Sequence, residues 1–314
     1  MSDFKGNEYV SKLTLGTAQL GSHYGIANKT GLPIRKERLK IIDYAINHGI
    51  NSIDTSPSYG DSEILIGEYV KSQNKKKNTE IPSIITKIPS VCFNNFITSE
   101  ERHQFVDKVV FNSLKRLNLT YLDNCLLHDP LDMIANQGEA VQYMLELKKR
   151  KIVKKIGVSV YEPEEVEAAL SLGCLDIIQI PINVFDQRLI KKNLLRKLYE
   201  ANIEIHGRSV FLQGLIFMSS NNLPKNMEGA KEFLESFRSL ARKVKLDVME
   251  LALLYVRDLP ELSKLIIGCE TINQIKKTLI LFMNLPPLEE AVIREIQDLF
   301  KYVPNEIIDP RKWS

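Results

Sequence analysis

Four side chains that can carry out acid–base chemistry stand at the ends of three short apolar runs. Asp54 closes NSID, Tyr59 follows it in SPSYG, Lys87 closes SIITK, and His128 follows NCLL. Reduction of a carbonyl requires a hydride on carbon and a proton on oxygen, and a tyrosine with an ordinary pKa of about 10 is a poor acid at neutral pH. A lysine ammonium beside the phenol favours the phenolate and lowers this pKa. We therefore interpret Tyr59 as a proton donor and Lys87 as the group that lowers its pKa.

Asp54 and His128 complete this predicted catalytic set. An aspartate paired with Lys87 keeps the ammonium charged and fixed in a partly dry site. His128 can donate a hydrogen bond that orients the carbonyl and stabilises negative charge on its oxygen. Each residue also has an ordinary interpretation, as a turn residue, a solvated lysine or a core histidine. The conjunction of four complementary groups on three successive strand ends favours a shared site.

Short runs rich in Ile, Val and Leu alternate with segments of helical period along the whole chain. The predicted strands cover eight ranges: 13–20, 51–55, 81–87, 122–128, 155–160, 177–183, 203–210 and 265–268. The predicted helices cover 35–48, 62–72, 99–117, 137–151, 163–172, 188–201, 230–257 and 271–282. Eight strand–helix pairs without a linker predict an α/β protein with a single closed (β/α)₈ TIM barrel.

The predicted barrel, a single domain over 1–314, carries three additions. Residues 1–12 are predicted as an N-terminal extension, 285–301 as an extra C-terminal helix, and 302–314 as a tail. An open doubly wound sheet is the alternative, but no GxGxxG follows the first predicted strand. In a barrel the active site is built at the carboxyl ends of the strands, where the four side chains above are predicted to lie.

Composition and residue spacing argue against several other classes of protein. The 42 basic and 39 acidic side chains are interspersed and give a formal charge of +3, too weak a field for nucleic acid. No apolar window is long enough for a membrane span or an export signal. Four separated cysteines without CxxC and five histidines without HxH or HExxH argue against disulfides and a metal site. These features predict a cytoplasmic protein without a metal and leave monomer or homo-oligomer open.

At these motifs the sequence resembles the aldo-keto reductase superfamily. The resemblance is carried by GTAQLG at 16–21, IDTSPSYG at 53–60 with Ser62-Glu63, ITK at 85–87 and LLH at 126–128. It implies an NAD(P)H-dependent oxidoreductase that reduces an aldehyde or ketone of a small molecule, with Tyr59 as the proton donor. GTAQLGSHYGIANKTG and GRSVFLQGL look most like bacterial members associated with surface-carbohydrate biosynthesis, which makes a sugar or nucleotide-sugar carbonyl the expected substrate.

The same resemblance implies a set of cofactor contacts. Ser159 and Gln179 match positions that hold the nicotinamide carboxamide, the loop 209–215 matches the one around the pyrophosphate, and 268–274 matches the site of the adenosine phosphate, where a helix start suits an anion. The complete predicted set is Gly16, Thr17, Asp54, Ser159, Gln179, Arg208, Ser209, Phe211, Gln213, Gly214, Gly268, Glu270, Thr271 and Gln274.

Several residues depart from the family pattern. Val160 stands where the family usually has Asn, and Arg208 stands where many members stack an aromatic ring on the nicotinamide. Gly268 and Gln274 replace the frequent Lys and Arg near the 2′-phosphate, and Glu270 adds a negative charge there. NADPH is the expected cofactor, with NADH as the alternative.

The positive charge of Arg208 indicates an anionic substrate. The predicted substrate pocket comprises His23, Tyr24, Asn183 and Arg208. A second hypothesis is a regulatory or scaffold subunit of the same superfamily that binds the cofactor with little or no turnover. Tight NADPH binding without turnover would distinguish it.

Overall fold

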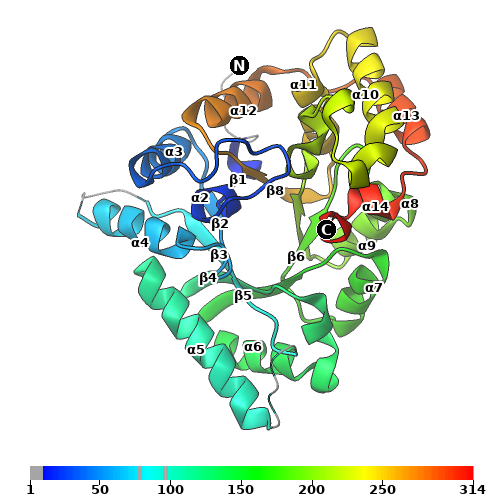
Figure 1. The fold of residues 1–314 in the computed structure, drawn as a ribbon. Helices are drawn as coiled ribbons and strands as arrows, with labels where there is room; N and C mark the ends of the chain where they lie inside the picture. The colour runs from blue at the N-terminus through cyan, green and yellow to red at the C-terminus, as the bar shows by residue number, and fades with distance from the viewer. Residues whose placement is uncertain (1–9, 76–79, 93, 95, 97, 314) are drawn as a thin grey trace.

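The computed structural model, described here for residues 10–75, 80–92, 94, 96 and 98–313, contains eight parallel strands that close into a barrel in chain order (Figure 1). The ring is closed by β8 against β1, with Gly268 opposite Gly16. The strands are β1 (Leu13–Gly16), β2 (Ser52–Asp54), β3 (Ser83–Ile88), β4 (Leu122–Leu127), β5 (Val153–Ser159), β6 (Ile177–Pro181), β7 (Glu204–Arg208) and β8 (Leu262–Gly268). The predicted single-domain (β/α)₈ barrel is confirmed.

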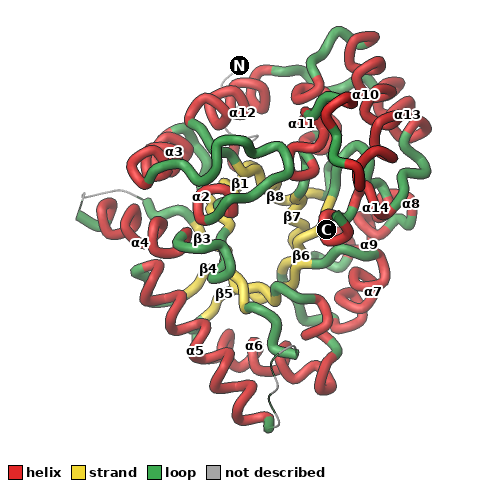
Figure 2. Tube along the Cα trace, viewed as in Figure 1, coloured by secondary structure: helices red, strands yellow, loops and turns green. Residues whose placement is uncertain are grey.

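Helices form an outer ring around the strands, as Figure 2 shows. They are α2 (Ala18–Gly21), α3 (Arg35–Asn47), α4 (Ser62–Gln73), α5 (Ser99–Leu117), α6 (Glu139–Lys149), α7 (Pro163–Leu172), α8 (Arg188–Lys191), α9 (Leu194–Glu200), α10 (Lys231–Lys243), α11 (Val248–Arg257), α12 (Ile272–Asn284), α13 (Glu290–Leu299) and α14 (Asn305–Ile308). Short 3₁₀ turns add η1 (Pro130–Met133), η2 (Ala135–Gly138), η3 (Leu212–Phe217), η4 (Ser220–Asn222), η5 (Lys225–Ala230) and η6 (Pro310–Lys312). Within the described residues no helix combines the length and apolar character needed to cross a bilayer.

In the structure, two predicted helices are each divided and one predicted strand is shorter. The prediction of one helix over 230–257 is wrong, because Lys245 adopts a left-handed φ of 59° and Asp247 begins α11 with a capping box. The predicted helix 188–201 is divided at Asn193, which has φ 56°. The predicted strand 13–20 ends at Gly16, where the Thr17 N–H and hydroxyl both bond to the carbonyl oxygen of Asp54.

Alternate residues of the strands point into the barrel and form its floor. Ile85, Leu126 and Ile177 form a buried apolar cluster separate from the larger core between strands and helices. Because side chains alternate along a strand, Lys87 points to the same side as Ile85, and Gln179 to the same side as Ile177. The apolar cluster therefore lies below polar side chains that stand at the carboxyl ends of the strands.

The first and last described segments of the chain both contribute buried residues. Residues 1–9 of the predicted N-terminal extension lie outside the described residues, and Val10 is buried. The extra helix predicted over 285–301 is α13. In the segment predicted as a tail, Ile307 and Ile308 of α14 are buried.

Candidate active site

The predicted catalytic side chains lie at the carboxyl ends of three neighbouring strands. Asp54 is the last residue of β2, and Lys87 stands one residue before the end of β3. His128 directly follows β4, and its backbone N–H donates to the carbonyl oxygen of Ile88 at 2.9 Å. Tyr59 lies in the turn after β2. Since the parallel strands β2, β3 and β4 are adjacent in the barrel, all four side chains meet at one edge.

Lys87 and Asp54 form an ion pair inside the barrel. The ammonium donates to Oδ1 and Oδ2 of Asp54 at 2.8 and 2.9 Å and to the carbonyl oxygen of Thr55 at 2.9 Å. Lys87 is 2% exposed and Asp54 is 4% exposed. Burial lowers the pKa of Lys87, and the charge of Asp54 opposes this shift. The hydrogen bonds therefore hold the lysine charge in one position.

The phenol of Tyr59 lies above this ion pair, with Lys87 Nζ 5.0 Å from the ring centroid. Burial raises the pKa of Tyr59, the negative charge of Asp54 adds to the increase, and Arg208 opposes it. The net shift is upward, opposite to the decrease predicted from the sequence, because burial and the charge of Asp54 outweigh the opposing charge of Arg208. The effect of Lys87 on this pKa stays a prediction. Tyr59 remains protonated at neutral pH, which is the form a proton donor requires.

Two glycines set the position of the Tyr59 turn. A Cβ on Gly60, which has φ +55°, would lie 2.0 Å from the carbonyl oxygen of Gly21. A Cβ on Gly21 would lie 1.8 Å from the carbonyl oxygen of Tyr59. Backbone therefore packs directly on backbone, and helix α2 fixes the turn that carries the phenol.

His128 lies edge-on to Tyr59, with ring centroids 5.8 Å apart and an interplanar angle of 82°. Burial and the charges of Lys87 and Arg208 lower the pKa of His128 to about 3. The imidazole is therefore neutral at physiological pH. Its Nδ1 lies 3.3 Å from the hydroxyl of Ser56. A neutral imidazole and a protonated phenol thus share one wall of the site.

A cavity of about 420 Å³ opens over these side chains, a size typical of small-molecule sites. Tyr59, His128 and Tyr24 line it, together with most of the predicted cofactor residues. The latter are Gly16, Thr17, Asp54, Ser159, Arg208, Ser209, Phe211, Gln213, Gly214, Gly268, Glu270 and Gln274.

Three predicted site residues are not among those that line the cavity but form hydrogen bonds to residues that do. Lys87 and Gln179 both bond to Asp54, with Gln179 Nε2 at 2.5 Å from Oδ2. Thr271 is the N-cap of α12 and accepts the N–H of Gln274. These three residues therefore position side chains of the cavity wall.

Two residues predicted for the substrate pocket are not among those that line the cavity. The Asn183 side chain accepts the N–H groups of Phe185 and Asp186, both at 2.9 Å, and donates to the carbonyl oxygen of Ser209. The assignment of Asn183 to the pocket is therefore corrected, because its polar atoms hold the loop after β6. His23 is exposed.

Sequence reasoning missed Tyr161, Gln19, Phe217 and Met249, which line the cavity. Tyr161 lies between two guanidinium groups, with Arg208 Cζ 4.1 Å and Arg311 Cζ 3.8 Å from its ring centroid. Its place two residues after Ser159, at the end of a predicted strand, is a signal that could have identified it.

The profile of the Aldo/keto reductase family matches residues 12–301 of the chain. The chain belongs to this family. D-arabinose 1-dehydrogenase of Saccharomyces cerevisiae is 31% identical over 212 residues, covering 62% of the chain and 61% of the relative. The match thus spans less than two thirds of the yeast relative. The NADH-specific methylglyoxal reductase of Escherichia coli is 24% identical over 276 residues, covering 80% of the chain and 84% of the relative.

Solved structures of other aldo-keto reductases share the fold. The holo form of AKR11C1 from Bacillus halodurans has a TM-score of 0.72 at 20% identity, covering 92% of the chain and 91% of that structure. The glycerol dehydrogenase AKR11B4 from Gluconobacter oxydans has a TM-score of 0.67 at 24% identity, covering 95% and 94%. These similarities extend over nearly the whole barrel.

In this aldo/keto reductase, a buried polar atom beside the cavity fits a nicotinamide carboxamide. Oε1 of Gln179 is buried and has no hydrogen-bond partner among the described residues, although Nε2 of the same side chain donates to Asp54. Buried polar atoms are almost always paired, so an amide donor from a ligand would satisfy this oxygen. Ser159, which faces the cavity, is the register partner of Gln179. The residues present therefore fit the group.

The loop after β7 has an unusual backbone where it lines the cavity. Three non-glycine residues have positive φ, namely Ser209 (63°), Leu212 (45°) and Gln213 (52°). Such conformations are costly and concentrate at ligand sites. The loop 209–214 is therefore suited to hold part of a ligand.

Arg208 brings a positive charge into the cavity wall. Nη2 donates to the carbonyl oxygen of Val160 at 2.9 Å and Nη1 to the hydroxyl of Ser209 at 3.3 Å. Nε is buried and has no partner within the described residues. Within the described part of the chain no carboxylate forms an ion pair with this guanidinium. Its charge is thus balanced only by carbonyl and hydroxyl dipoles and by the ring of Tyr161.

The neighbouring part of the cavity wall, after β8, carries a negative group, Glu270. Burial raises the pKa of Glu270, and His23 opposes this increase. Arg208 is the sole Lys or Arg among the described residues that line the cavity. The wall formed by Gly268, Glu270 and Gln274 therefore offers no positive side chain to a phosphate.

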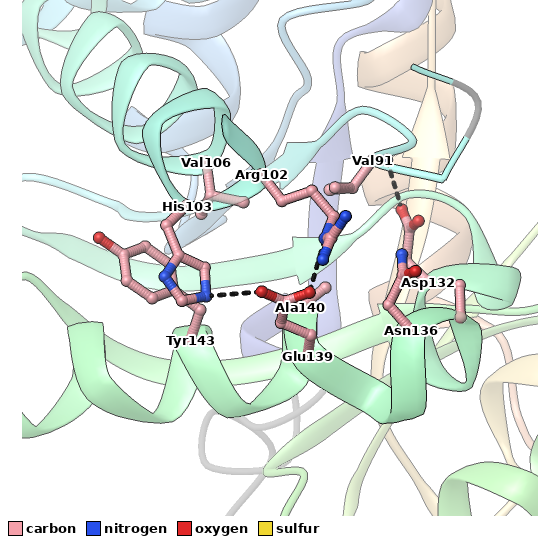
Figure 3. Close-up of a pocket in the computed structure, with 10 residues that line it drawn as sticks. Val91, Arg102, His103, Val106, Asp132, Asn136, Glu139, Ala140 and Tyr143 are labelled. Carbon is pink, nitrogen blue, oxygen red and sulfur yellow. Dashed lines mark hydrogen bonds and ion pairs between the residues drawn. The ribbon is translucent and has the colours of Figure 1, made fainter. Parts of the chain in front are cut away.

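A second, much smaller cavity of about 10 Å³ lies between α5 and α6 (Figure 3). Arg102 and His103 of α5 contact Glu139 of α6 at 2.5 and 3.2 Å, and the His103 ring stacks on Tyr143. This space is close to the size of one water molecule, so these residues connect the two helices. No group of three or more potential metal ligands occurs among the residues that the structure describes.

Proposed function

We propose that this chain is an NAD(P)H-dependent oxidoreductase that reduces an aldehyde or ketone, with Tyr59 as proton donor. The observation that carries this proposal is the convergence of a protonated phenol, a neutral imidazole and a buried ion pair on one wall of a cavity. The family relationship supports it. A bound nicotinamide would supply the hydride.

Each side chain of this wall then has a distinct task. Tyr59 donates its proton to the carbonyl oxygen, and the phenolate that forms lies over the ammonium of Lys87. Asp54 holds this ammonium in place through two hydrogen bonds. His128 donates a hydrogen bond to the same carbonyl oxygen and orients it. Ser159, Gln179 and the loop 209–214 are the residues that would hold the cofactor.

The choice of cofactor is a finer part of the proposal. The resemblance to the family predicts NADPH. The wall after β8 favours NADH instead, because a 2′-phosphate there would meet Glu270 and, among the described lining residues of that wall, no Lys or Arg side chain. One relative is named an NADH-specific methylglyoxal reductase. We therefore propose that NADH binds at least as tightly as NADPH.

The proposed substrate is a small carbonyl compound that carries a negative charge. Arg208 supports this choice, because its guanidinium lines the cavity without a carboxylate partner among the described residues. Two relatives are named for sugars, D-arabinose 1-dehydrogenase and L-galactose dehydrogenase. An acidic or phosphorylated sugar carbonyl, or a nucleotide-linked keto sugar, meets both criteria.

A turnover screen tests the proposal. Purified protein is incubated with NADH or NADPH and with a panel of sugar aldehydes, nucleotide-linked keto sugars and simple acidic and neutral aldehydes, and loss of reduced cofactor is followed by absorbance. We expect turnover, with the acidic members preferred. Tight cofactor binding in a fluorescence titration, combined with no turnover of any compound, would contradict the proposal and favour a regulatory or scaffold subunit.

A further inference from the structure

Ser56 lies beside the imidazole of His128 and has no role in the steps described above. Its side chain is completely buried, and its Oγ lies 3.3 Å from His128 Nδ1. The same oxygen accepts the backbone N–H of Ser58 at 3.1 Å. Because the Ser58 amide supplies the proton of that bond, the hydroxyl proton of Ser56 is free to be donated to Nδ1.

The direction of this bond determines which imidazole nitrogen carries the proton. A neutral imidazole has one N–H and one acceptor nitrogen, and the partner of one nitrogen sets the role of the other. If Nδ1 accepts from Ser56, the proton lies on Nε2. Among the described residues, none forms a hydrogen bond with Nε2, and His128 lines the cavity. Nε2 is thus the nitrogen available to a ligand.

We propose that Ser56 is a positioning residue that holds His128 in the tautomer with the proton on Nε2. In this tautomer His128 donates to a carbonyl oxygen, whereas the other tautomer would present a lone pair to that oxygen and repel it. Ser58 contributes through its backbone, since its N–H occupies one of the two acceptor lone pairs of the Ser56 hydroxyl. Among the described residues, His128 Nδ1 is the one acceptor that this hydroxyl proton has. The tautomer is a property of the protein alone; its effect on catalysis rests on the proposed function.

Nitrogen NMR measures the tautomer directly in the full-length protein. The chain has five histidines, so ¹⁵N-histidine labelling gives few signals, and the His128 signals are assigned by their loss in His128→Gln. We expect the wild-type protein to show a protonated, pyrrole-type Nε2 and an unprotonated, pyridine-type Nδ1 for His128. Ser56→Ala should show averaged signals from both tautomers.

Kinetics provide the second readout. Loss of one hydrogen bond that selects the tautomer should lower kcat/KM by about five- to tenfold in Ser56→Ala, with an unchanged dissociation constant for the cofactor. Ser56→Thr retains the hydroxyl and should restore the Nε2 tautomer and most of the activity. The matched control is Ser58→Ala, which removes an exposed hydroxyl but leaves the backbone N–H in place, and should match the wild type in both readouts.

The outcomes separate this inference from the proposed function. A wild-type His128 with its proton on Nδ1, or an unchanged tautomer in Ser56→Ala, would overturn the inference even if the enzyme reduces carbonyls. The Nε2 tautomer in the wild type and its loss in Ser56→Ala would support the inference even if no carbonyl is reduced. Melting curves of all variants check that each one folds.

Discussion

The two sides of the barrel mouth differ in how their polar side chains are satisfied. On the side of β2 to β4, the ammonium of Lys87 bonds to Asp54 and Thr55, and His128 Nδ1 faces Ser56. On the side of β5 to β8, Gln179 Oε1 and Arg208 Nε are buried and find no hydrogen-bond partner in the part of the chain that the structure describes. Glu270 forms no ion pair within the described ranges.

This difference distinguishes groups suited to catalysis from groups suited to ligand binding. Groups that act on the reacting atoms gain from a fixed position, because hydrogen bonds within the protein orient them before a ligand arrives. Groups that bind a ligand leave donors, acceptors and charge for that ligand to satisfy. Under the proposed function, the β2–β4 side is the preorganised reactive wall, and the β5–β8 side is the wall whose partners the cofactor and substrate would supply.

The largest expected effect is that of Tyr59→Phe. Removing the proton donor should lower kcat by about 10³-fold, within the range of general acid catalysis, while the dissociation constant of the cofactor stays within about twofold. Steady-state kinetics and a fluorescence titration measure the two quantities. Tyr24→Phe, which removes another phenol of the same cavity, should lower kcat by less than about tenfold. Equal losses in both variants would contradict the division of roles.

Lys87→Met should destabilise the fold as well as abolish activity. Removing one partner of a buried pair leaves the Asp54 charge uncompensated, which costs about 3 to 5 kcal/mol in the free energy of unfolding. The control is Lys243→Met, whose exposed pair with Glu295 should cost less than about 1 kcal/mol. Urea denaturation of both variants provides the comparison. A similar small loss in both would show that the Lys87–Asp54 pair is not held as the structure indicates.

His128 gives the stability a pH dependence of defined sign. Its pKa falls from 6.5 to about 3 on folding, so the unfolded chain binds the proton first as the pH falls. The free energy of unfolding should therefore decrease from about pH 6.5 toward about pH 3, with a slope of at most about 1.4 kcal/mol per pH unit from this group. Urea titrations at several pH values should show a shallower decrease in His128→Gln. Parallel curves would exclude a depressed pKa.

Arg208→Gln tests the charge on the binding wall. Loss of a charged hydrogen bond should reduce kcat/KM for an acidic aldehyde such as succinic semialdehyde. This reduction should be roughly 10- to 100-fold larger than the reduction of kcat/KM for neutral butanal. Arg208→Lys keeps the charge but loses the planar fork, and should give an intermediate value. If kcat/KM falls equally for both aldehydes, Arg208 has a role other than recognition of a negatively charged substrate.

Glu270→Gln should have the smallest effect, and this effect should be confined to the affinity for the cofactor. Removing the carboxylate should tighten NADPH binding by about fivefold and leave NADH binding unchanged, because repulsion of about 1 kcal/mol is lost from a partly exposed site. Fluorescence titrations with both cofactors measure this difference. Preferential NADPH binding by the wild-type protein would contradict the proposed cofactor choice.

The reactive wall could be predicted from the sequence more fully than the binding wall. Asp54, Lys87 and His128 stand at the ends of strands whose apolar runs are clear, so the topology alone places them at one edge. The direction of the Tyr59 pKa shift could not be predicted, because it depends on burial and on the charges of Asp54 and Arg208.

The binding wall depends on loops, and loop conformation does not follow from periodicity. Tyr161 lines the cavity and stacks with Arg208. Met249 of α11 also lines the cavity, far in the sequence from the strand ends on which the prediction is based. Asn183 was misplaced for the same reason. The division of the predicted helix 230–257 depends on the left-handed conformation of Lys245 and on the capping box at Asp247.

The most direct test of the central claim follows a deuterium atom. The protein is loaded with one equivalent of reduced cofactor in which both hydrogens at C4 of the nicotinamide are deuterium. An excess of the best carbonyl substrate is added, and the alcohol is analysed by mass spectrometry. We predict an alcohol with deuterium on the former carbonyl carbon, formed rapidly by the wild type and about 10³-fold more slowly by Tyr59→Phe. An alcohol without deuterium, or equal rates in the two proteins, would contradict hydride transfer with Tyr59 as the proton donor.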